Sequence, residues 1–437
     1  MEGGATETPL TQAQIEEAVE ALFPEAVEML SQLVAIDSQL CCQGEAKVQD
    51  FMESFFKSSL NLSRVDRFAI RLEDIKDLPG YSPADWNYDG KDCVVGVHKS
   101  RTQKGKSLIL NGHVDVVPPG PSDMWSNRQP FEPVIKDGRL YGRGAGDMKA
   151  GVVAYCMALK ALQSLGYAPA ADLFLQSVVE EECTGNGALA CSVGKGSLYK
   201  ADACIIPEPF AGTIMTGQLG VMWMRIRVRG RPAHVLNTSA GINGIEAAYY
   251  LYGELKQVEE RWNSAEERAK HPVYSHIAHP INFNLGTITG GEWASSVATE
   301  CTFDVRIGFF PGKQLQEVRE EIETAVKDAA AKKNIPYTLQ WRGFQAEGCL
   351  IDPEGDMMKL LGATHKKVTN QEPIYAPVTC TTDARFFQLY QGTPATCYGP
   401  EATNIHGIDE SVSLESMKQV CKVLAVFISE WCGLETL

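Results

Sequence analysis

The sequence has no long hydrophobic run, no excess of basic charge and no C-x-x-C motif. No stretch of about 20 apolar residues, the length that crosses a bilayer as a helix, occurs in the chain. Asp and Glu number 55 against 40 Lys and Arg, which gives a formal net charge of −15. So acidic a chain is a poor partner for nucleic acid or for an anionic membrane. We therefore expect neither as a partner, although a local basic pocket is compatible with this charge.

The thirteen cysteines are scattered singly, apart from the adjacent Cys41 and Cys42, and an odd number cannot pair completely within one chain. Free, buried thiols in a reducing compartment are the simpler interpretation. The N-terminal residues, MEGGATETPLTQAQIEE, are acidic and contain no apolar core, so they do not resemble a signal peptide. The sequence thus predicts a cytoplasmic protein.

At 437 residues the chain is too long for one ordinary core, so two domains are expected. Hydrophobic residues make up 44% and charged residues 22%, as in globular proteins. Thr11 and Gln14 form a capping-box pattern that predicts the start of an amphipathic helix. Pro24 is expected to interrupt this helix before a second segment that reaches about Ile36. A further helix is expected over about 45–60.

The chain is organised around residues 108–151, LILNGHVDVVPPGPSDMWSNRQPFEPVIKDGRLYGRGAGDMKAG. The first three residues form an unalternated apolar run, which is typical of a strand covered on both faces. His113 and Asp115 follow at the carboxyl end of this strand, where open α/β sheets place their sites. An imidazole there can bind zinc while a nearby carboxylate orients it, but an isolated H-x-D is more often a polar turn.

Asp147 stands at the entrance of a helix expected over 148–165, after the glycine-rich approach GRLYGRGAGD. By position alone, a helix N-cap is the commoner role for such an aspartate. A metal ligand is the alternative.

Two further acidic segments follow predicted strands. A strand over 172–179 ends in Glu180-Glu181-Glu182, and a short strand over 203–206 is followed by Pro207-Glu208-Pro209. Three adjacent carboxylates usually form a solvated surface run, but beside a dication their repulsion becomes attraction. The two prolines restrict the backbone around Glu208, as suits a fixed ligand, although a simple edge turn is the commoner meaning.

Beyond Gly220 the pattern changes, because apolar residues alternate with Trp or Arg over 222–229 and predict a half-exposed antiparallel strand. A helical pattern around 242–252, strands near 281–288 and 297–307, a helix over 315–331 and a strand over 337–341 follow. This β-α-β-β-α-β order is that of a ferredoxin-like unit inserted in the first domain.

Six motifs, in this order, resemble those of one known family: GHVDVVP, DGRLYGRGAGDMK, EEECTGNGA, IIPEP, GRPAH and HGIDE. They are similar to motifs of the co-catalytic zinc amidohydrolases and peptidases, which include acetylornithine deacetylase, succinyl-diaminopimelate desuccinylase, aminoacylase and glutamate carboxypeptidase. The resemblance implies an α/β catalytic domain, a mostly parallel sheet with helices on both faces, and an inserted ferredoxin-like α+β domain for lid and dimerisation. The implied boundaries are 1–218 and 341–437 for the two parts of the catalytic domain and 219–340 for the lid.

The same resemblance implies a dinuclear metal site. His113 and Glu208 would bind one zinc ion, Glu182 and His406 the other, and Asp147 would bridge the two. Zinc suits this mixture of imidazole and carboxylate ligands, with Co²⁺ or Mn²⁺ as substitutes.

By the family match, Glu181 is the general base and Asp115 orients the first histidine. Glu180 stands where the family usually has Asp, which leaves the assignment of base and ligand open by one residue. Asp409 and Glu410, close after the last motif histidine, are expected to cap the terminal helix over about 414–430.

Three residues are candidates for contacts with the substrate. His234 of GRPAH matches a histidine that the partner subunit usually supplies and that hydrogen-bonds the scissile carbonyl oxygen, although a lone loop histidine is more often solvated. Arg306 matches an arginine that can bind a substrate carboxylate, with a structural salt bridge as the alternative. Thr382 lies in TCTTDARF, which resembles the family's substrate-facing loop but lacks its glycines.

The resemblance predicts hydrolysis of a C–N amide bond in a small N-acyl amino acid or N-acyl amine, by an acetylornithine deacetylase-like deacylase. A dipeptidase or carboxypeptidase is the alternative with the same chemistry. An inactive homologue that serves as a binding module would have lost a ligand or the base, and none is missing from the sequence. The expected partners are a small-molecule substrate and a second copy of the chain, bound through the lid.

Overall fold

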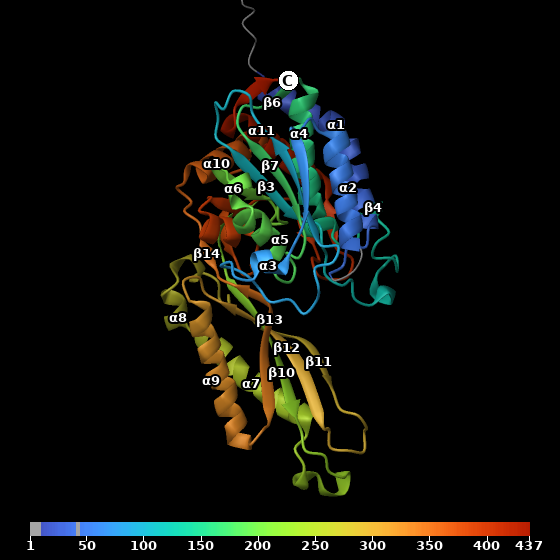
Figure 1. Cartoon of the computed structure of the whole chain (residues 1–437), viewed down its shortest axis with the longest axis vertical. Coiled ribbons are helices and arrows are strands. Elements are labelled where there is room, and N and C mark those ends of the chain that lie inside the picture. The colour runs from blue at the N-terminus through green and yellow to red at the C-terminus, as the bar shows by residue number, and fades with distance from the viewer. Residues whose placement is uncertain (1–9, 41–43) are drawn as a thin grey trace, which may run out of the picture.

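The computed structural model describes residues 10–40 and 44–437, which form a larger part and, below it in Figure 1, a smaller part. Cys41 and Cys42 lie outside the described residues. So do residues 1–9, on which the prediction of no signal peptide partly rests.

The larger part is built on a six-stranded sheet of order β1-β2-β7-β3-β8-β16. Four neighbouring strands are parallel: β7 (Leu173–Val178), β3 (Leu108–His113), β8 (Ala203–Ile206) and β16 (Ala395–Cys397). β2 (Asp92–His98) and β1 (Arg64–Ala69) extend the sheet in antiparallel fashion. Every residue of β3 and β7 is buried, as expected for strands covered on both faces. The mostly parallel sheet is confirmed.

Helices lie on both sides of this sheet. α1 (Gln12–Ala35), α2 (Gly44–Ser59) and α4 (Ala150–Ser164) stand on its right in Figure 1, and the short α5 (Asn186–Leu189) and α6 (Gly196–Tyr199) on its left. α4 packs against α1 and α11 (Leu414–Trp431), and α10 (Asp356–Thr369) packs against α11. The single-turn α3 (Leu72–Ile75) follows β1.

The first helix differs from the expectation, because α1 runs without a break through Pro24 and the predicted interruption is wrong. Proline removes one main-chain hydrogen bond and crowds the preceding turn. In α1 this cost is offset by the burial of one helix face, including Leu30 and Leu33, in the large core. The capping box of Thr11 and Gln14 is confirmed.

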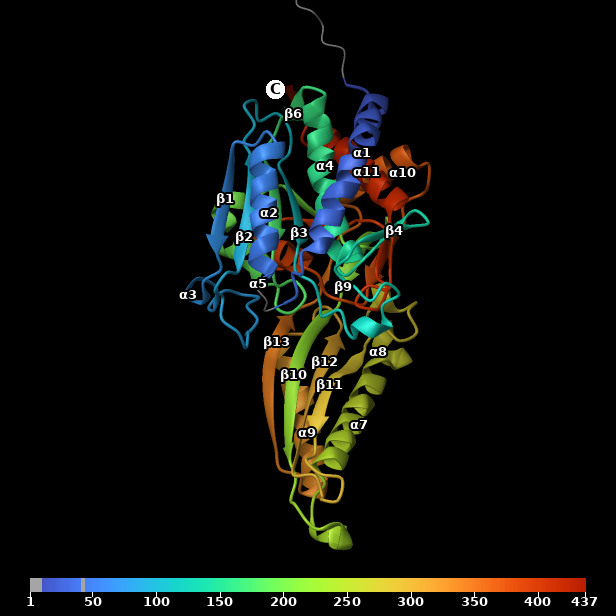
Figure 2. The same cartoon turned by 90° about the vertical axis from the view of Figure 1, so that its right-hand side faces the viewer.

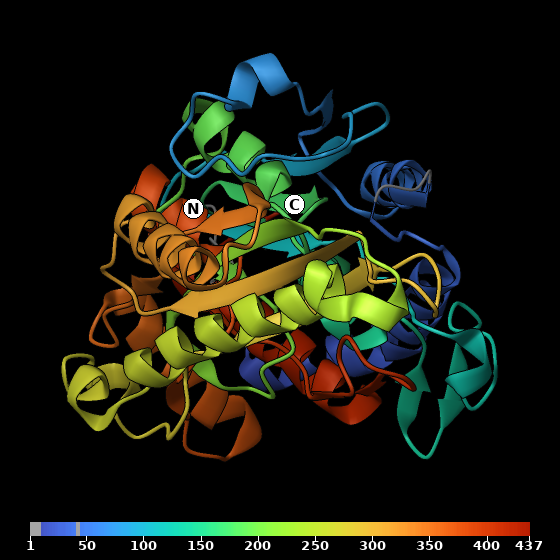
Figure 3. The same cartoon turned by 90° about the horizontal axis from the view of Figure 1, so that it is seen from below.

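The smaller part is a four-stranded antiparallel sheet of order β11-β12-β10-β13 with two long helices, as Figure 2 shows. Figure 3, seen from below, places this part in front of the larger one. Its own apolar core is formed by side chains between Leu219 and Ile335. The predicted β-α-β-β-α-β order is confirmed by β10 (Gly220–Arg229), α7 (Gly244–Trp262), β11 (Phe283–Gly290), β12 (Glu300–Phe309), α9 (Leu315–Lys333) and β13 (Tyr337–Ala346). A short helix that was not predicted, α8 (Ala265–Ala269), lies between α7 and β11.

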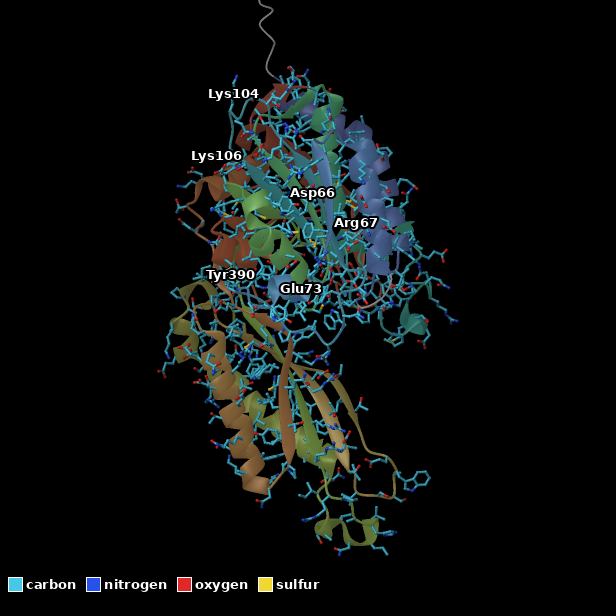
Figure 4. The ribbon with its side chains drawn as sticks, in the orientation of Figure 1. Asp66, Arg67, Glu73, Lys104, Lys106 and Tyr390 are labelled. Atoms are coloured by element: carbon cyan, nitrogen blue, oxygen red, sulfur yellow. The ribbon has the colours of Figure 1, made fainter. Side chains whose placement is uncertain are left out.

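The two parts meet where β13 returns to the larger part. The amide of Gly343 donates to the carbonyl of Pro83 (2.8 Å). Tyr390, at the lower end of the larger part in Figure 4, donates its hydroxyl to Glu347 (2.7 Å). The division of the chain at 218/219 and 340/341 stays a prediction, and the second of these positions lies within β13.

Small sheets complete the larger part. They pair β14 (Cys349–Leu350), β9 (Ile214–Gln218) and β15 (Tyr375–Val378); β17 (Ala402–Thr403), β18 (Ser411–Ser413), β5 (Arg139–Tyr141) and β4 (Val134–Lys136); and β19 (Leu434–Thr436) and β6 (Tyr167–Pro169).

The described residues contain neither a membrane-spanning helix nor a disulfide among themselves. No helix within 10–40 or 44–437 is both long enough and apolar enough to cross a membrane. The cysteines of residues 44–437 form no disulfide with one another, and all but Cys380 are buried.

Candidate metal centre and active site

Polar residues from several segments meet at one edge of the large sheet. His113 is the last residue of β3, the triplet 180–182 follows β7, and Glu208 follows β8. Because these strands are parallel neighbours, their carboxyl ends lie at the same edge. Asp147 reaches this edge from the approach to α4, and His406 from the loop between β17 and β18. The three glutamates of the triplet are buried there, so they are not a solvated surface run.

Asp147 stands between two histidines. Its Oδ1 lies 3.2 Å from His113 Nε2, and its Oδ2 lies 3.2 Å from His406 Nε2. α4 begins only at Ala150 and has no side-chain cap, so Asp147 does not act as its N-cap. One carboxylate therefore faces both imidazoles, as a ligand shared by two cations would.

A second carboxylate lies beside each histidine. His113, Asp147 and Glu208 offer ligand atoms within 4.8 Å of one another, and so do Asp147, Glu182 and His406. In the latter group, His406 Nε2 lies 3.0 Å from Glu182 Oε2. The structure thus brings together the two groups of residues expected from the sequence, with Asp147 in both.

Burial and the close carboxylates shift the pKa values of these groups. The negative charge of Glu182 raises the pKa of His406 to about 11. Burial lowers the pKa of His113, but its hydrogen bond with Asp147 and the neighbouring carboxylates outweigh burial and raise that pKa well above its usual value. Burial also raises the pKa of the Glu208 and Glu182 carboxyls. Buried carboxylates in this number need positive charge close by, and their oxygens together with imidazole nitrogens are donors that suit divalent transition metals.

Asp115 holds both the first histidine and the glutamate turn. The ring Nδ1 of His113 lies 3.0 Å from the main-chain oxygen of Asp115 and 3.6 Å from its carboxylate. The carboxylate instead accepts the amides of Glu181 (3.3 Å) and Glu182 (3.2 Å). The main chain of Asp115 therefore orients the imidazole, which leaves Nε2 to face the cluster, and its side chain holds the two glutamates.

Glu181 lies close to both clusters and belongs to neither. Its Oε2 is 3.9 Å from His113 Nε2, beyond hydrogen-bonding distance. Burial raises the pKa of its carboxyl well above the usual value, against the opposing charge of His113. A buried carboxyl beside a cation site that does not use it as a ligand suits proton transfer.

The expected capping of the terminal helix is wrong. α11 is capped by Ser413, whose side chain accepts the amide of Ser416. Asp409 instead accepts the amide of Ser126 (2.8 Å), and Glu410 points toward the Asp147 loop.

Glu410 is a residue of the site that sequence reasoning missed. Its carboxylate accepts the amides of Gly146 (2.9 Å) and Asp147 (3.0 Å) and pairs with Arg143 (2.5 Å). It therefore fixes the loop that presents Asp147 to the histidines. The available signal was the glycine-rich loop itself, because the amides of an irregular buried loop need an acceptor from elsewhere in the chain.

A pocket of 370 Å³ opens beside these groups and is lined by both parts of the molecule. Glu181, Glu182 and His406 line it from the larger part. Val221, Trp223 and Phe344 contribute an apolar wall from the smaller part, where the two aromatic rings meet edge to face. A small organic molecule bound here would contact the acidic cluster and the apolar wall together.

Of the three predicted substrate contacts, the structure places one in this pocket. Arg306 lines it and donates to the carbonyl of Thr379 (3.4 Å), and burial lowers the pKa of its guanidinium. Thr382 is buried, and its hydroxyl donates to the side-chain oxygen of Gln218 (2.6 Å). Cys380 and Thr381, from the same loop, line the pocket instead.

His234 lies away from the site of its own chain. It is exposed and precedes the short turn Val235–Ala240, where its Nδ1 accepts the amide of Leu236 (3.2 Å). In Figure 1 this turn forms the lowest point of the smaller part, at the end remote from the large sheet. A catalytic role for His234 therefore requires that it act on a neighbouring chain.

Comparison with known proteins places this site in a family. The sequence model of peptidase family M20/M25/M40 matches residues 109–430. An N-formyl-4-amino-5-aminomethyl-2-methylpyrimidine deformylase of Bacillus subtilis is 31% identical over 81% of this chain and 86% of its own length. A succinyl-diaminopimelate desuccinylase of Alkalilimnicola ehrlichii is 26% identical over 76% of this chain and 88% of its own.

Among solved structures, the dipeptidase Dug1p of Saccharomyces cerevisiae matches with a TM-score of 0.80 at 14% identity, over 97% of this chain and 98% of that one. This likeness supports the fold alone. The family match begins in β3 and ends in α11, so it includes every residue of the two clusters. The resemblance seen in the motifs is confirmed: the chain belongs to peptidase family M20/M25/M40.

Proposed function

We propose that the protein is a metal-dependent amidohydrolase that removes a small acyl group from an amino acid or amine. The observation that carries the proposal is the shared carboxylate of Asp147, which lies 3.2 Å from an imidazole on either side. One cation would be held by His113 and Glu208, the other by Glu182 and His406, with Asp147 between them.

Zinc is the proposed metal, with Co²⁺ or Mn²⁺ as substitutes, since two imidazoles and three carboxylates form the donor set. When bound, two dications polarise the attacked carbonyl group and lower the pKa of the attacking water. The side chains of the protein supply the proton transfers and the orientation.

Glu181 is proposed to accept the proton of the attacking water and to deliver it to the amine nitrogen as the C–N bond breaks. Neither cluster uses its carboxylate as a ligand, so both oxygens are available. Asp115 holds Glu181 in place through the amide of that residue. His234 of a second copy is proposed to donate a hydrogen bond to the carbonyl oxygen as negative charge develops there.

The substrate is proposed as a class. The names of the relatives, a deformylase and a desuccinylase, support removal of a small acyl group from nitrogen. The apolar wall of Trp223 and Phe344 can contact the substrate, and Arg306 offers a guanidinium to a carboxylate. Arg306 is equally compatible with the second candidate, a dipeptidase, because a dipeptide ends in a carboxylate just as an N-acyl amino acid does.

A panel of N-formyl, N-acetyl, N-succinyl and dipeptide substrates decides between the two candidates. With metal-loaded protein, we expect kcat/KM to be highest for an N-acyl compound and at least about tenfold lower for dipeptides, which corresponds to about 1.4 kcal/mol of transition-state binding. The reverse order would establish the dipeptidase. No turnover of any panel member by protein with full metal content would contradict both.

We also propose a cytoplasmic homodimer that assembles through the smaller part, with 219–340 as its lid domain. β11 is an exposed edge strand. Leu236 is 90% and Trp293 is 74% exposed, on loops that a bridge between His234 and Ser296 holds together. Exposed sheet edges and apolar side chains of this kind are commonly covered by a partner, and free buried cysteines suit a reducing compartment.

Metal analysis should find about two divalent ions per chain, because the ligand set exceeds what one tetrahedral ion needs. His406→Ala should lower the affinity for one of the two ions by more than about 100-fold and leave the binding of the other unchanged, since only one cluster contains His406. Chelator titration with elemental analysis measures both quantities. His276→Ala, at an exposed histidine of the smaller part, is the control and should retain both ions. One tight ion at saturation in the wild type would exclude the dinuclear arrangement.

A further inference from the structure

Glu180, the first glutamate of the triplet, takes no part in either cluster and does not line the pocket. Its side chain is completely buried. Its φ of +68° lies in the left-handed region, which disfavours residues with a Cβ. Such a conformation persists only where the surroundings hold it in place.

The contacts of Glu180 hold the turn that contains the other two glutamates. Its main-chain oxygen accepts the amides of Thr184 (3.0 Å) and Gly185 (2.7 Å). Its Oε2 accepts the hydroxyl of Thr184 (2.8 Å), and its Oε1 accepts the indole N–H of Trp86 (2.5 Å). The main-chain oxygen and the side-chain carboxylate of Glu180 therefore both fix the path of residues 180–185.

Lys91 adds a charge to this arrangement. Its Nζ lies 3.2 Å from Glu180 Oε1 and also pairs with Glu45 of α2. The three side chains are all buried. Buried charges are costly unless they are paired in good geometry, so the ion pairs tie the turn to α2 in one position.

Trp86 is itself part of a fixed segment. Its neighbour Asp85 pairs with Arg342 of β13 (2.7 Å). Four residues earlier than Trp86, the carbonyl of Ser82 accepts the side-chain amide of Asn186 (2.8 Å), which lies just beyond the glutamate turn. The indole N–H is therefore presented to Glu180 by a segment that is anchored at two positions shortly before Trp86.

We propose that Glu180 is a positioning residue: with Lys91 and Trp86, it fixes the turn that aims Glu181 and Glu182 at the metal centre and the pocket. Asp115 holds the amides of the same two glutamates, at 3.3 and 3.2 Å, so the turn is held at its main chain and at the Glu180 side chain together. The proposal rests on the proposed roles of Glu181 as base and Glu182 as ligand.

Glu180→Gln tests the proposal, because it keeps the shape of the side chain and removes the charge that faces Lys91. In metal-loaded enzyme we expect kcat to fall by about 10- to 100-fold with KM within about threefold, and one of the two zinc ions to bind more weakly by a similar factor. Steady-state kinetics measures the first effect. Chelator competition measures the second and needs no substrate.

Glu435→Gln is the matched control, because Glu435 of β19 is also a buried glutamate, whose carboxylate accepts the amides of Arg101 and Thr102 and belongs to neither cluster. Per folded molecule, it should change neither kcat nor metal affinity by more than about twofold, the scale of an unrelated side-chain change. Circular dichroism gives the folded fraction of each variant. A purely structural Glu180 would behave as this control does.

Trp86→Phe is the milder second variant, useful if Glu180→Gln folds poorly. It keeps an aromatic ring and removes the indole donor. The kcat and the affinity for one zinc ion should therefore both fall, by about 3- to 10-fold. Values within twofold of wild type for both variants, or losses that follow the folded fraction alone, would overturn the proposal. Weaker metal binding without any turnover by the wild type would support the role of Glu180 and contradict the proposed reaction.

Discussion

Glu181→Gln is expected to lower kcat by about 100- to 10,000-fold while fold and metal content stay at wild-type values. The amide has nearly the size and shape of the carboxylate, but it cannot accept the proton of the attacking water. Metal should be retained because Glu181 lies outside both ligand clusters. Kinetics and elemental analysis on one preparation, with a thermal melt, measure all three quantities.

The neighbouring substitution, Glu182→Gln, is the matched control. Glu182 Oε2 lies 3.0 Å from His406 Nε2, within the second cluster. Loss of this carboxylate should therefore release one metal ion or lower the affinity for it. Because both variants change one buried carboxylate to an amide, they differ only in role. If Glu181→Gln lost metal and Glu182→Gln kept it, base and ligand would be displaced by one residue, the ambiguity that the EEE triplet leaves in the sequence.

Three of the proposed ligands, His113, Glu182 and Glu208, could be picked out because each stands at a local boundary that leaves a mark in the sequence. His113 ends an apolar run, the glutamates end another, and Glu208 lies between two prolines. Parallel strands bring such boundaries to one sheet edge, so strand order alone accounts for their meeting. The roles of the individual residues came from the family motifs, since neither periodicity nor spacing distinguishes a base from a ligand.

Contacts between distant segments were not predictable in the same way. Glu410 accepts the amide of Asp147 across 263 positions of sequence, and no periodic pattern reports that pairing. From its local sequence, Glu410 was expected to cap the terminal helix. Its carboxylate instead makes the long-range contact with the Asp147 loop. Pro24 shows the same competition, because the tertiary packing of α1 outweighs a local helix-breaking preference. Thr382 likewise donates its buried hydroxyl to Gln218, a residue that is distant in the sequence.

An equal mixture of His234→Ala and Glu181→Gln chains is expected to regain about a quarter of wild-type activity after subunit exchange, although each parent homodimer should be nearly inactive. The reason is the position of His234 at the remote end of the smaller part, where it can serve only the site of a neighbouring chain. Each complete site would then take Glu181 from one chain and His234 from the other. In the mixed dimer one site receives both wild-type residues, and the other receives neither.

The expected value follows from random pairing. Equal amounts of the two chains give about half mixed dimers, and each of these carries one intact site of two, which is about a quarter of all sites. Loss of the His234 hydrogen bond alone should cost about 100- to 1,000-fold in kcat, so the background from the parent homodimers is low. The measurement is kcat after verified subunit exchange, against each parent treated in the same way.

The matched control mixes Glu181→Gln with Glu182→Gln chains. Both residues lie in the site of their own chain, with their amides on the same Asp115 carboxylate, so exchange leaves every site defective and no activity should return. Recovery in the first mixture and not in the second would locate His234 in the partner's site and would make the dimer a requirement for catalysis. No recovery in the first mixture despite exchange, or full activity of a dilute monomer, would mean that His234 does not act across the dimer.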